Sequence, residues 1–182
     1  MKRFLMGLAL TLLAGAAFAA EPFTLTSPEV RNGGTLTDEQ IFNSFGCSGK
    51  NISPELEWKN PPAGTKSFAV TVYDPDAPTG SGWWHWVVFN IPASEHGLAL
   101  NAGGEPAKLP AGAVQSLTDF GTTGYGGACP PPGDKPHRYI FTVYALNVEK
   151  LDLASRTTPA MVGFAVRGNL LGKAELTATY GR

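Results

Sequence analysis

The sequence predicts a mainly β protein, and three observations support this fold class. Aromatic and β-branched residues form several runs that alternate with a period of two, as half-buried strands do. The 182 residues include 22 Gly and 15 Pro, which suit a fold of many strands joined by ordered loops. Only one segment combines a helical pattern with start and stop signals.

The expected strands follow one another along most of the chain. Phe68, Val70 and Val72 alternate with smaller or polar residues, and the run from 137 to 146 is the clearest of all. The run from 83 to 91 is too apolar to have a fully solvent-exposed face. Six segments are predicted as strands: residues 23–26, 67–74, 83–91, 113–118, 137–146 and 174–180.

The one expected helix begins after residue 157. Thr158 is suited to the N-cap and Pro159 to the first helical position. Gly172 is placed to end the helix. Four residues at helical spacing are expected on one face: Met161, Phe164, Ala165 and Gly168.

The first residues indicate export from the cytoplasm. Lys2 and Arg3 precede an apolar run over 4–13, and Ala17-Phe18-Ala19 forms an A-x-A site. This pattern predicts a signal peptide over 1–19, cleaved after Ala19, and a periplasmic or secreted protein. The alternative is a membrane anchor, but the run is shorter than the roughly 20 residues that span a bilayer. Residues 20–182 contain no repeat, linker or further spanning stretch, so one domain is expected.

Charge and cysteine content narrow the expected partners and the compartment. The net charge is −1 and the basic residues form no cluster, which argues against a nucleic-acid partner. Cys47 and Cys129 are the only cysteines. In an oxidising compartment such a pair is more often a disulfide than two thiols, although the sequence does not give their separation in space.

Three polar residues lie on rows that otherwise serve the core. Asp74 continues the row of Val70 and Val72, and His137 begins the row that contains Phe141. Strict alternation places His85 on one face with three apolar neighbours: Trp83, Val87 and Phe89. A buried polar group without a partner costs roughly 1–3 kcal/mol, so contact among the three, a shared pocket, or both is expected.

Two stiff loops adjoin these residues, over 74–78 and 121–136. Gly lets backbone amides approach a ligand and Pro keeps a loop rigid, so an anion-binding cradle is one interpretation. The alternatives are core histidines, an ordinary turn, or a metal site of one Asp and two His that lacks the usual close His spacing. A nucleophilic Cys129 is a further alternative, and no G-x-S-x-G motif offers a serine nucleophile.

Three long motifs carry a resemblance to a known family. They are FGCSGKNISPELEW (45–58), DPDAPTGSGWWHWVVFNIP (74–92) and YGGACPPPGDKPHRYIFTVYAL (125–146). They resemble the signature regions of the phosphatidylethanolamine-binding protein family, in its bacterial Raf-kinase-inhibitor-like branch of the YbhB/YbcL type. The resemblance implies a large central antiparallel sheet, a smaller second sheet, peripheral helices, and an anion pocket at one end of the sheet. Eukaryotic members cover part of the pocket with a final helix, so a more open pocket is expected here.

The resemblance also implies the residues of that pocket and its function. It implies binding of a small phosphate-like anion or phospho-headgroup. No catalytic residue, metal or cofactor is expected, and a protein partner or a homodimer is left open. The alternative is a hydrolase of phosphate or acyl esters with His85 or His137 as general base. A third hypothesis is a secreted inhibitor of a protease or signalling protein. The implied pocket residues are Asp74, Pro78, Trp83, His85, Gly126, Gly127, His137 and Tyr139.

Overall fold

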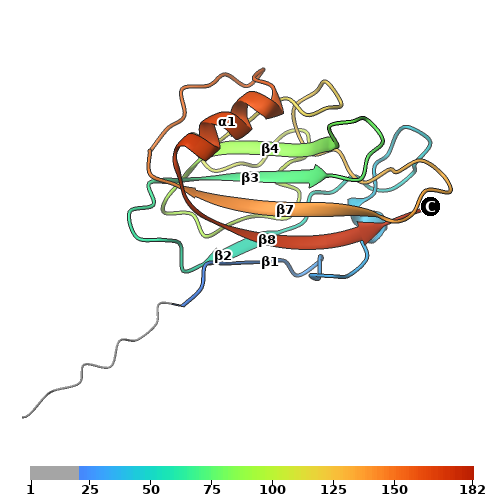
Figure 1. Cartoon of the computed structure of the whole chain (residues 1–182), viewed down its shortest axis with the longest axis horizontal. Helices are drawn as coiled ribbons and strands as arrows, with labels where there is room; N and C mark the ends of the chain where they lie inside the picture. Colours follow the sequence, from blue (N-terminus) through green and yellow to red (C-terminus); the bar gives the residue numbers. More distant parts are fainter. Residues whose placement is uncertain (1–20) are drawn as a thin grey trace, which may run out of the picture.

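The computed structural model describes residues 21–182, which form two antiparallel sheets and one α-helix (Figure 1). The larger sheet has the strand order β6-β4-β3-β7-β8, and the smaller one has the order β1-β2-β5. The expected signal peptide over 1–19 lies outside the described residues. The strands are β1 (Thr24–Thr26), β2 (Leu56–Lys59), β3 (Ser67–Asp74), β4 (Trp83–Pro92), β5 (Gly97–Leu98), β6 (Val114–Gln115), β7 (His137–Leu146) and β8 (Leu170–Tyr180).

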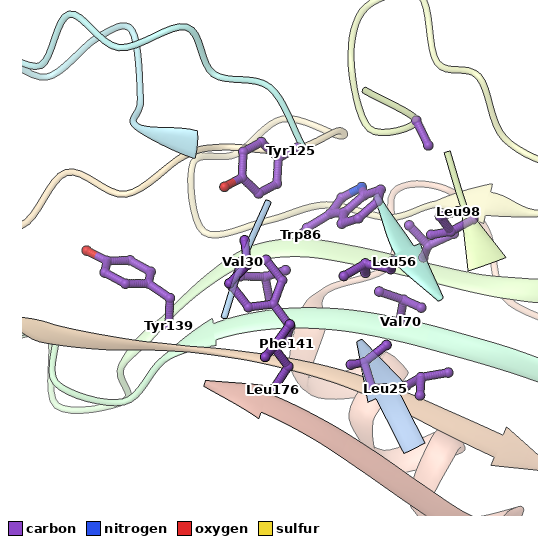
Figure 2. Packing of buried hydrophobic residues seen from close by; sticks show 14 of the residues in the cluster. Leu25, Val30, Leu56, Val70, Trp86, Leu98, Tyr125, Tyr139, Phe141 and Leu176 are labelled. Carbon is purple, nitrogen blue, oxygen red and sulfur yellow. The ribbon is translucent and has the colours of Figure 1, made fainter. Parts of the chain in front are cut away.

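Both faces of the larger sheet are covered, which explains why β3 and β4 read as nearly continuous apolar runs. On one face an inner cluster packs against the smaller sheet, and Trp58 of β2 lies 5.2 Å from Phe68 of β3 between ring centroids. Figure 2 shows this cluster, with Leu56 and Val70 at its centre and Tyr139 at one end. On the other face an outer cluster joins Val87 to the α-helix α1 (Pro159–Gly168) through Val162.

The mainly β prediction and its principal strands are confirmed, whereas two short strands were missed. β2 covers only four residues and β5 only two, too few for an alternation pattern to stand out. The expected strand over 113–118 shrinks to two residues in β6. Of the peripheral helices that the resemblance implied, the described residues contain α1 and one turn of 3₁₀-helix, Asp38–Gln40. No helix in residues 21–182 is long and apolar enough to cross a membrane.

The start of α1 agrees with the prediction, but its end does not. The Thr158 hydroxyl accepts from the Met161 amide, and Pro159 occupies the first turn. The helix ends at Gly168 because the Asn169 side chain donates to the Ala165 carbonyl, which satisfies one of the open helical carbonyls. Gly172, the predicted stop, lies inside β8 and pairs with Ala145.

The face of α1 that packs on the sheet also differs from the expected face. The buried residues are Pro159, Val162 and Val166. Met161 and Phe164 point outward, with 51% and 76% of their surface exposed. The stripe of Pro159, Val162 and Val166 has the same helical spacing as the expected one, so periodicity alone did not separate the two faces.

A bulge in β4 changes the direction of His85. Val72 pairs with Trp86 and Tyr73 pairs with Trp84, so His85 is the extra residue between them. Val87 accordingly packs in the outer cluster, whereas His85 contacts the ring of Tyr139, which belongs to the inner cluster. The prediction that His85 shares a face with Val87 and Phe89 was wrong, because strict alternation fails at a bulge.

Candidate functional site

A cavity of about 220 Å³ lies at the end of the larger sheet where β3 ends and β4 and β7 begin. The register brings these strand ends together, since Asp74 pairs with Trp83 of β4 and the preceding Tyr73 pairs with Ile140 of β7 (Figure 1). We call this cavity the end pocket. Its lining residues are Phe45, Asp74, Ala77, Pro78, Thr79, Trp83, His85, Phe120, Cys129, Pro130, Pro131, His137 and Tyr139.

Asp74 and His137 form a buried pair in this pocket. The Asp74 Oδ2 atom lies 2.7 Å from His137 Nδ1, and both side chains are almost fully buried. The other carboxylate oxygen of Asp74 accepts from the amides of Asp76 and Ala77, at 2.8 and 3.1 Å. The far side of the His137 ring faces Asp134, with Nε2 3.5 Å from its Oδ2. Asp74 therefore fixes both the following loop and the orientation of the His137 ring.

His85 is held from the opposite side of the pocket. Its Nδ1 donates to the Gly126 carbonyl at 2.7 Å and lies 3.2 Å from the Gly127 carbonyl. Its other ring nitrogen, Nε2, is buried and has no hydrogen-bond partner among the described residues. Burial lowers the pKa of His85 below its ordinary value of 6.5, because the charged imidazolium loses its hydration.

Tyr139 supplies a second buried polar atom without a partner. Its hydroxyl makes no hydrogen bond within the described part of the chain, and its ring lies edge-on to His85 with centroids 5.1 Å apart. Burial raises the pKa of the Tyr139 hydroxyl above its ordinary value, so this group keeps its proton. Because such atoms are costly to leave unpaired, both mark places for ligand atoms or water.

Aromatic and proline side chains form the rest of the wall. Phe120 lies between His85 and Trp83, with both ring centroids about 5.4 Å from its own and both contacts edge-on. Phe45 closes one side and is 64% exposed. The pocket thus has a polar floor and an apolar rim, the usual composition of a small-molecule site.

Gly126 and Gly127 support the pocket from behind rather than line it. Their carbonyls orient His85, and the Gly127 amide donates to the Asn51 side chain at 2.7 Å. A Cβ atom at Gly126 would collide with the Phe120 ring, and one at Gly127 would collide with the backbone around Gln40. These positions therefore need glycine for close packing.

The disulfide between Cys47 and Cys129 is confirmed, and it lies in the pocket wall. It joins the loop of Phe45 to the loop of Pro130, with the two Cα atoms 6.0 Å apart. Arg182 ties the same two loops a second time, because its guanidinium donates to the carbonyls of Pro130 at 2.7 Å and Gly46 at 2.8 Å. Among the described residues, no side-chain carboxylate lies within ion-pair distance of this guanidinium, so these backbone carbonyls are its hydrogen-bond partners.

The structure brings six of the eight predicted pocket residues to one cavity: Asp74, Pro78, Trp83, His85, His137 and Tyr139. Sequence reasoning missed Phe45, Phe120 and Arg182, which lie in loops without any periodic pattern. Phe120 and Phe45 adjoin glycines, the single local signal that could have drawn attention to them. Within residues 21–182, no cluster of three or more His, Cys, Asp or Glu side chains is arranged to hold a metal ion.

The two antiparallel sheets and the buried Asp–His pair describe a mainly β protein with a small-molecule pocket at the end of its larger sheet. The comparisons with known proteins agree with this description. The family model described as "Phosphatidylethanolamine-binding protein" matches residues 26–181. The chain belongs to this family, and the relatives place it in the YbcL/YbhB type that the motifs indicated.

Two relatives from Escherichia coli K12 and two solved structures illustrate the similarity. The UPF0098 protein YbcL is 53% identical over 93% of this chain and 94% of its own length, and the UPF0098 protein YbhB is 52% identical over 86% and 98%. The crystal structure of E. coli YbcL superposes with a TM-score of 0.86 at 54% identity, covering 88% of this chain and 98% of that chain. The homologue CT736 from Chlamydia trachomatis gives a TM-score of 0.74 at 33% identity, covering 88% and 97%.

Proposed function

We propose that this protein is exported and binds a small phosphate-like anion or a phosphorylated headgroup in the end pocket, through which it modulates a protein partner. The family to which the chain belongs, named for a phospholipid with a phosphorylated headgroup, supports a pocket of this kind. The cavity of about 220 Å³ suits a headgroup-sized ligand rather than a large one.

One observation carries the proposal: two buried polar atoms, His85 Nε2 and Tyr139 Oη, have no partner in the described part of the chain. Both residues line the end pocket, so an oxyanion bound there would give these atoms hydrogen-bond partners. The walls are already fixed by the disulfide and by prolines, which lowers the entropic cost of binding.

The disulfide also supports export. A bond between Cys47 and Cys129 persists in an oxidising compartment and is rare in the cytosol. This agrees with the signal peptide that the sequence predicts over 1–19.

Titration calorimetry with inorganic phosphate, on protein that begins at residue 20, tests the binding. We expect saturable binding that the His85→Ala variant weakens by about tenfold or more, because a hydrogen bond and its fixed geometry are lost. His96→Ala is the matched control, since this histidine lies in a different surface groove. Absence of anion binding at every pH from 5 to 8 would contradict the proposal.

A hydrolase of phosphate or acyl esters is the second candidate, and the buried Asp74–His137 pair favours it. Such a pair orients an imidazole as a general base, and the unpartnered Nε2 of His85 is a free acceptor of protons. Cys129 cannot supply the nucleophile while it is bonded to Cys47. Turnover of a panel of chromogenic esters that His85→Ala and His137→Ala abolish would favour the enzyme over the binding protein.

A further inference from the structure

The hydrogen bonds of His85 determine which of its nitrogens carries the proton. Nδ1 points at two carbonyl oxygens, those of Gly126 and Gly127, at 2.7 and 3.2 Å. Carbonyl oxygens only accept, so Nδ1 is the donor. In a neutral imidazole the remaining nitrogen, Nε2, then presents a lone pair, and this is the unpartnered atom at the pocket.

The surroundings keep His85 neutral near pH 7. Burial lowers its pKa, and this effect outweighs the opposing attraction of Asp74 and Asp119 for a proton on the ring. The two carbonyls that accept from Nδ1 act in the same direction as the carboxylates and are likewise outweighed. The titratable groups around the ring are Asp74 on β3, His137 and Tyr139 on β7, and Asp119 and Tyr125 on the loops that pack against β4.

A neutral hydrogen-bond acceptor such as His85 Nε2 is an unusual group in a pocket that binds anions. A fully deprotonated oxyanion would place a negative oxygen against the lone pair of Nε2, with the Asp74 carboxylate lining the same cavity. An oxyanion that carries a hydroxyl would instead donate that proton to Nε2. Another of its oxygens could accept from the Tyr139 hydroxyl, which keeps its proton.

We propose that His85 makes the end pocket selective for oxyanions that bring their own hydroxyl. This inference rests on the proposed function and narrows its ligand class to hydrogen phosphate and singly protonated phosphomonoesters, in preference to sulfate and phosphodiesters. It therefore favours a free phosphate or a monoester headgroup over an intact phospholipid, whose phosphate is a diester. His85 acts in this role as an acceptor, so the selectivity depends on the ionisation of the ligand rather than on that of the histidine.

Four small anions distinguish ionisation of the ligand from ionisation of His85 in one calorimetric series from pH 5 to 8. Inorganic phosphate keeps a hydroxyl over this whole range, methyl phosphate loses its own above about pH 6, and sulfate and dimethyl phosphate have none. We expect phosphate to bind throughout, and methyl phosphate to weaken by about a hundredfold between pH 6 and pH 8. Sulfate and dimethyl phosphate should bind about tenfold to a hundredfold more weakly than phosphate at pH 7, as expected when a buried acceptor stays unpaired.

The outcomes distinguish this inference from the proposed function. If no probe binds, the anion-binding function itself fails. If sulfate and dimethyl phosphate bind as tightly as phosphate at pH 7, the function stands and the selectivity is overturned. Affinities that all rise together as the pH falls would also overturn it, because they would show a protonated His85 donating to every anion alike.

Two further measurements do not depend on the ligand series. Nitrogen-15 NMR of the His85 ring in the free protein should show a protonated Nδ1 and an unprotonated Nε2 at pH 7, and the reverse assignment would overturn the inference. The His85→Gln variant places an amide that can either donate or accept near the same position, so the preference for phosphate over sulfate should shrink about tenfold. An unchanged preference in a folded variant would show that His85 is not the source. Tyr139→Phe is the matched control, since it removes a donor that serves both anions equally.

Discussion

At the scale of single residues, Asp76 and Arg138 show how the loop after β3 is fixed beside the pocket. The Arg138 guanidinium donates to both carboxylate oxygens of Asp76, at 2.7 and 2.8 Å, and the Arg138 amide donates to one of them as well. These hydrogen bonds lower the pKa of Asp76 from 3.8 to about 2. Asp76 is the third residue of the stretch that begins with Asp74, so the pair anchors one wall of the pocket to β7.

Replacing Asp76 by Asn should destabilise the protein at neutral pH but not at pH 2. A carboxyl group whose folded pKa is lowered stabilises the fold above its unfolded pKa, and this contribution disappears as the pH falls from about 4 to about 2. The loss should be small and weaker in high salt, because the Arg138 side chain is 55% exposed. Thermal unfolding at pH 7 and pH 2 checks it, and an equal difference at both pH values would contradict the explanation.

The residues of the site differ in how far the sequence could predict them. Asp74 and His137 lie in regular strands, where alternation places them on the core side correctly. His85 could not be placed by the same rule, because the bulge that turns it depends on pairing with β3, which a single strand does not encode. Arg182 acts through backbone carbonyls of two distant loops, and no residue pattern marks such a contact.

At the scale of elements, one side of the pocket wall consists of two loops that lie outside the named strands and are joined by an isolated bridge between Ile41 and Ala128. One contains Phe45 and Cys47, and the other contains Cys129 and Pro130. The disulfide spans a sequence separation of 82 residues. Closing a loop of this length restricts the unfolded chain much more than a local link would.

Removing the disulfide should therefore lower stability strongly and affinity weakly. The double variant Cys47→Ser, Cys129→Ser should lose about 4 kcal/mol of unfolding free energy in the chain-entropy model. Phosphate affinity should fall only a few-fold, because Arg182 still joins the two loops. Denaturant unfolding and calorimetry measure the two effects.

Two comparisons control this prediction. Wild-type protein under reducing conditions should match the double serine variant, and Arg182→Gln with the disulfide intact should show the smaller loss of stability. A reduced protein as stable as the oxidised one would contradict the role given to the disulfide.

At the scale of the whole molecule, the sequence predicts the larger sheet better than what covers it. β3, β4 and β7 are long and apolar, so their existence follows from composition and period. β2 and β5 pair with each other and pack on the inner face of the larger sheet, so their formation depends on tertiary contacts rather than on local sequence. The orientation of α1 has the same origin: two apolar stripes were available, and contact with Val87 and Phe89 selected the one that contains Val162.

Two phenylalanines compare a covered face of the larger sheet with the outward face of α1. Phe141 lies in the inner cluster with no exposed surface, whereas Phe164 on α1 is 76% exposed. Phe141→Ala should lower the unfolding free energy by about 3–5 kcal/mol, because it removes a packed ring and leaves a cavity. Phe164→Ala should change it by no more than about 0.5 kcal/mol, since its ring packs on little in the chain itself. Denaturant unfolding of the two variants side by side measures both values. A large loss for Phe164→Ala would show that the outward face of α1 is covered, for example by a second copy of the chain, and the loss would then grow with protein concentration.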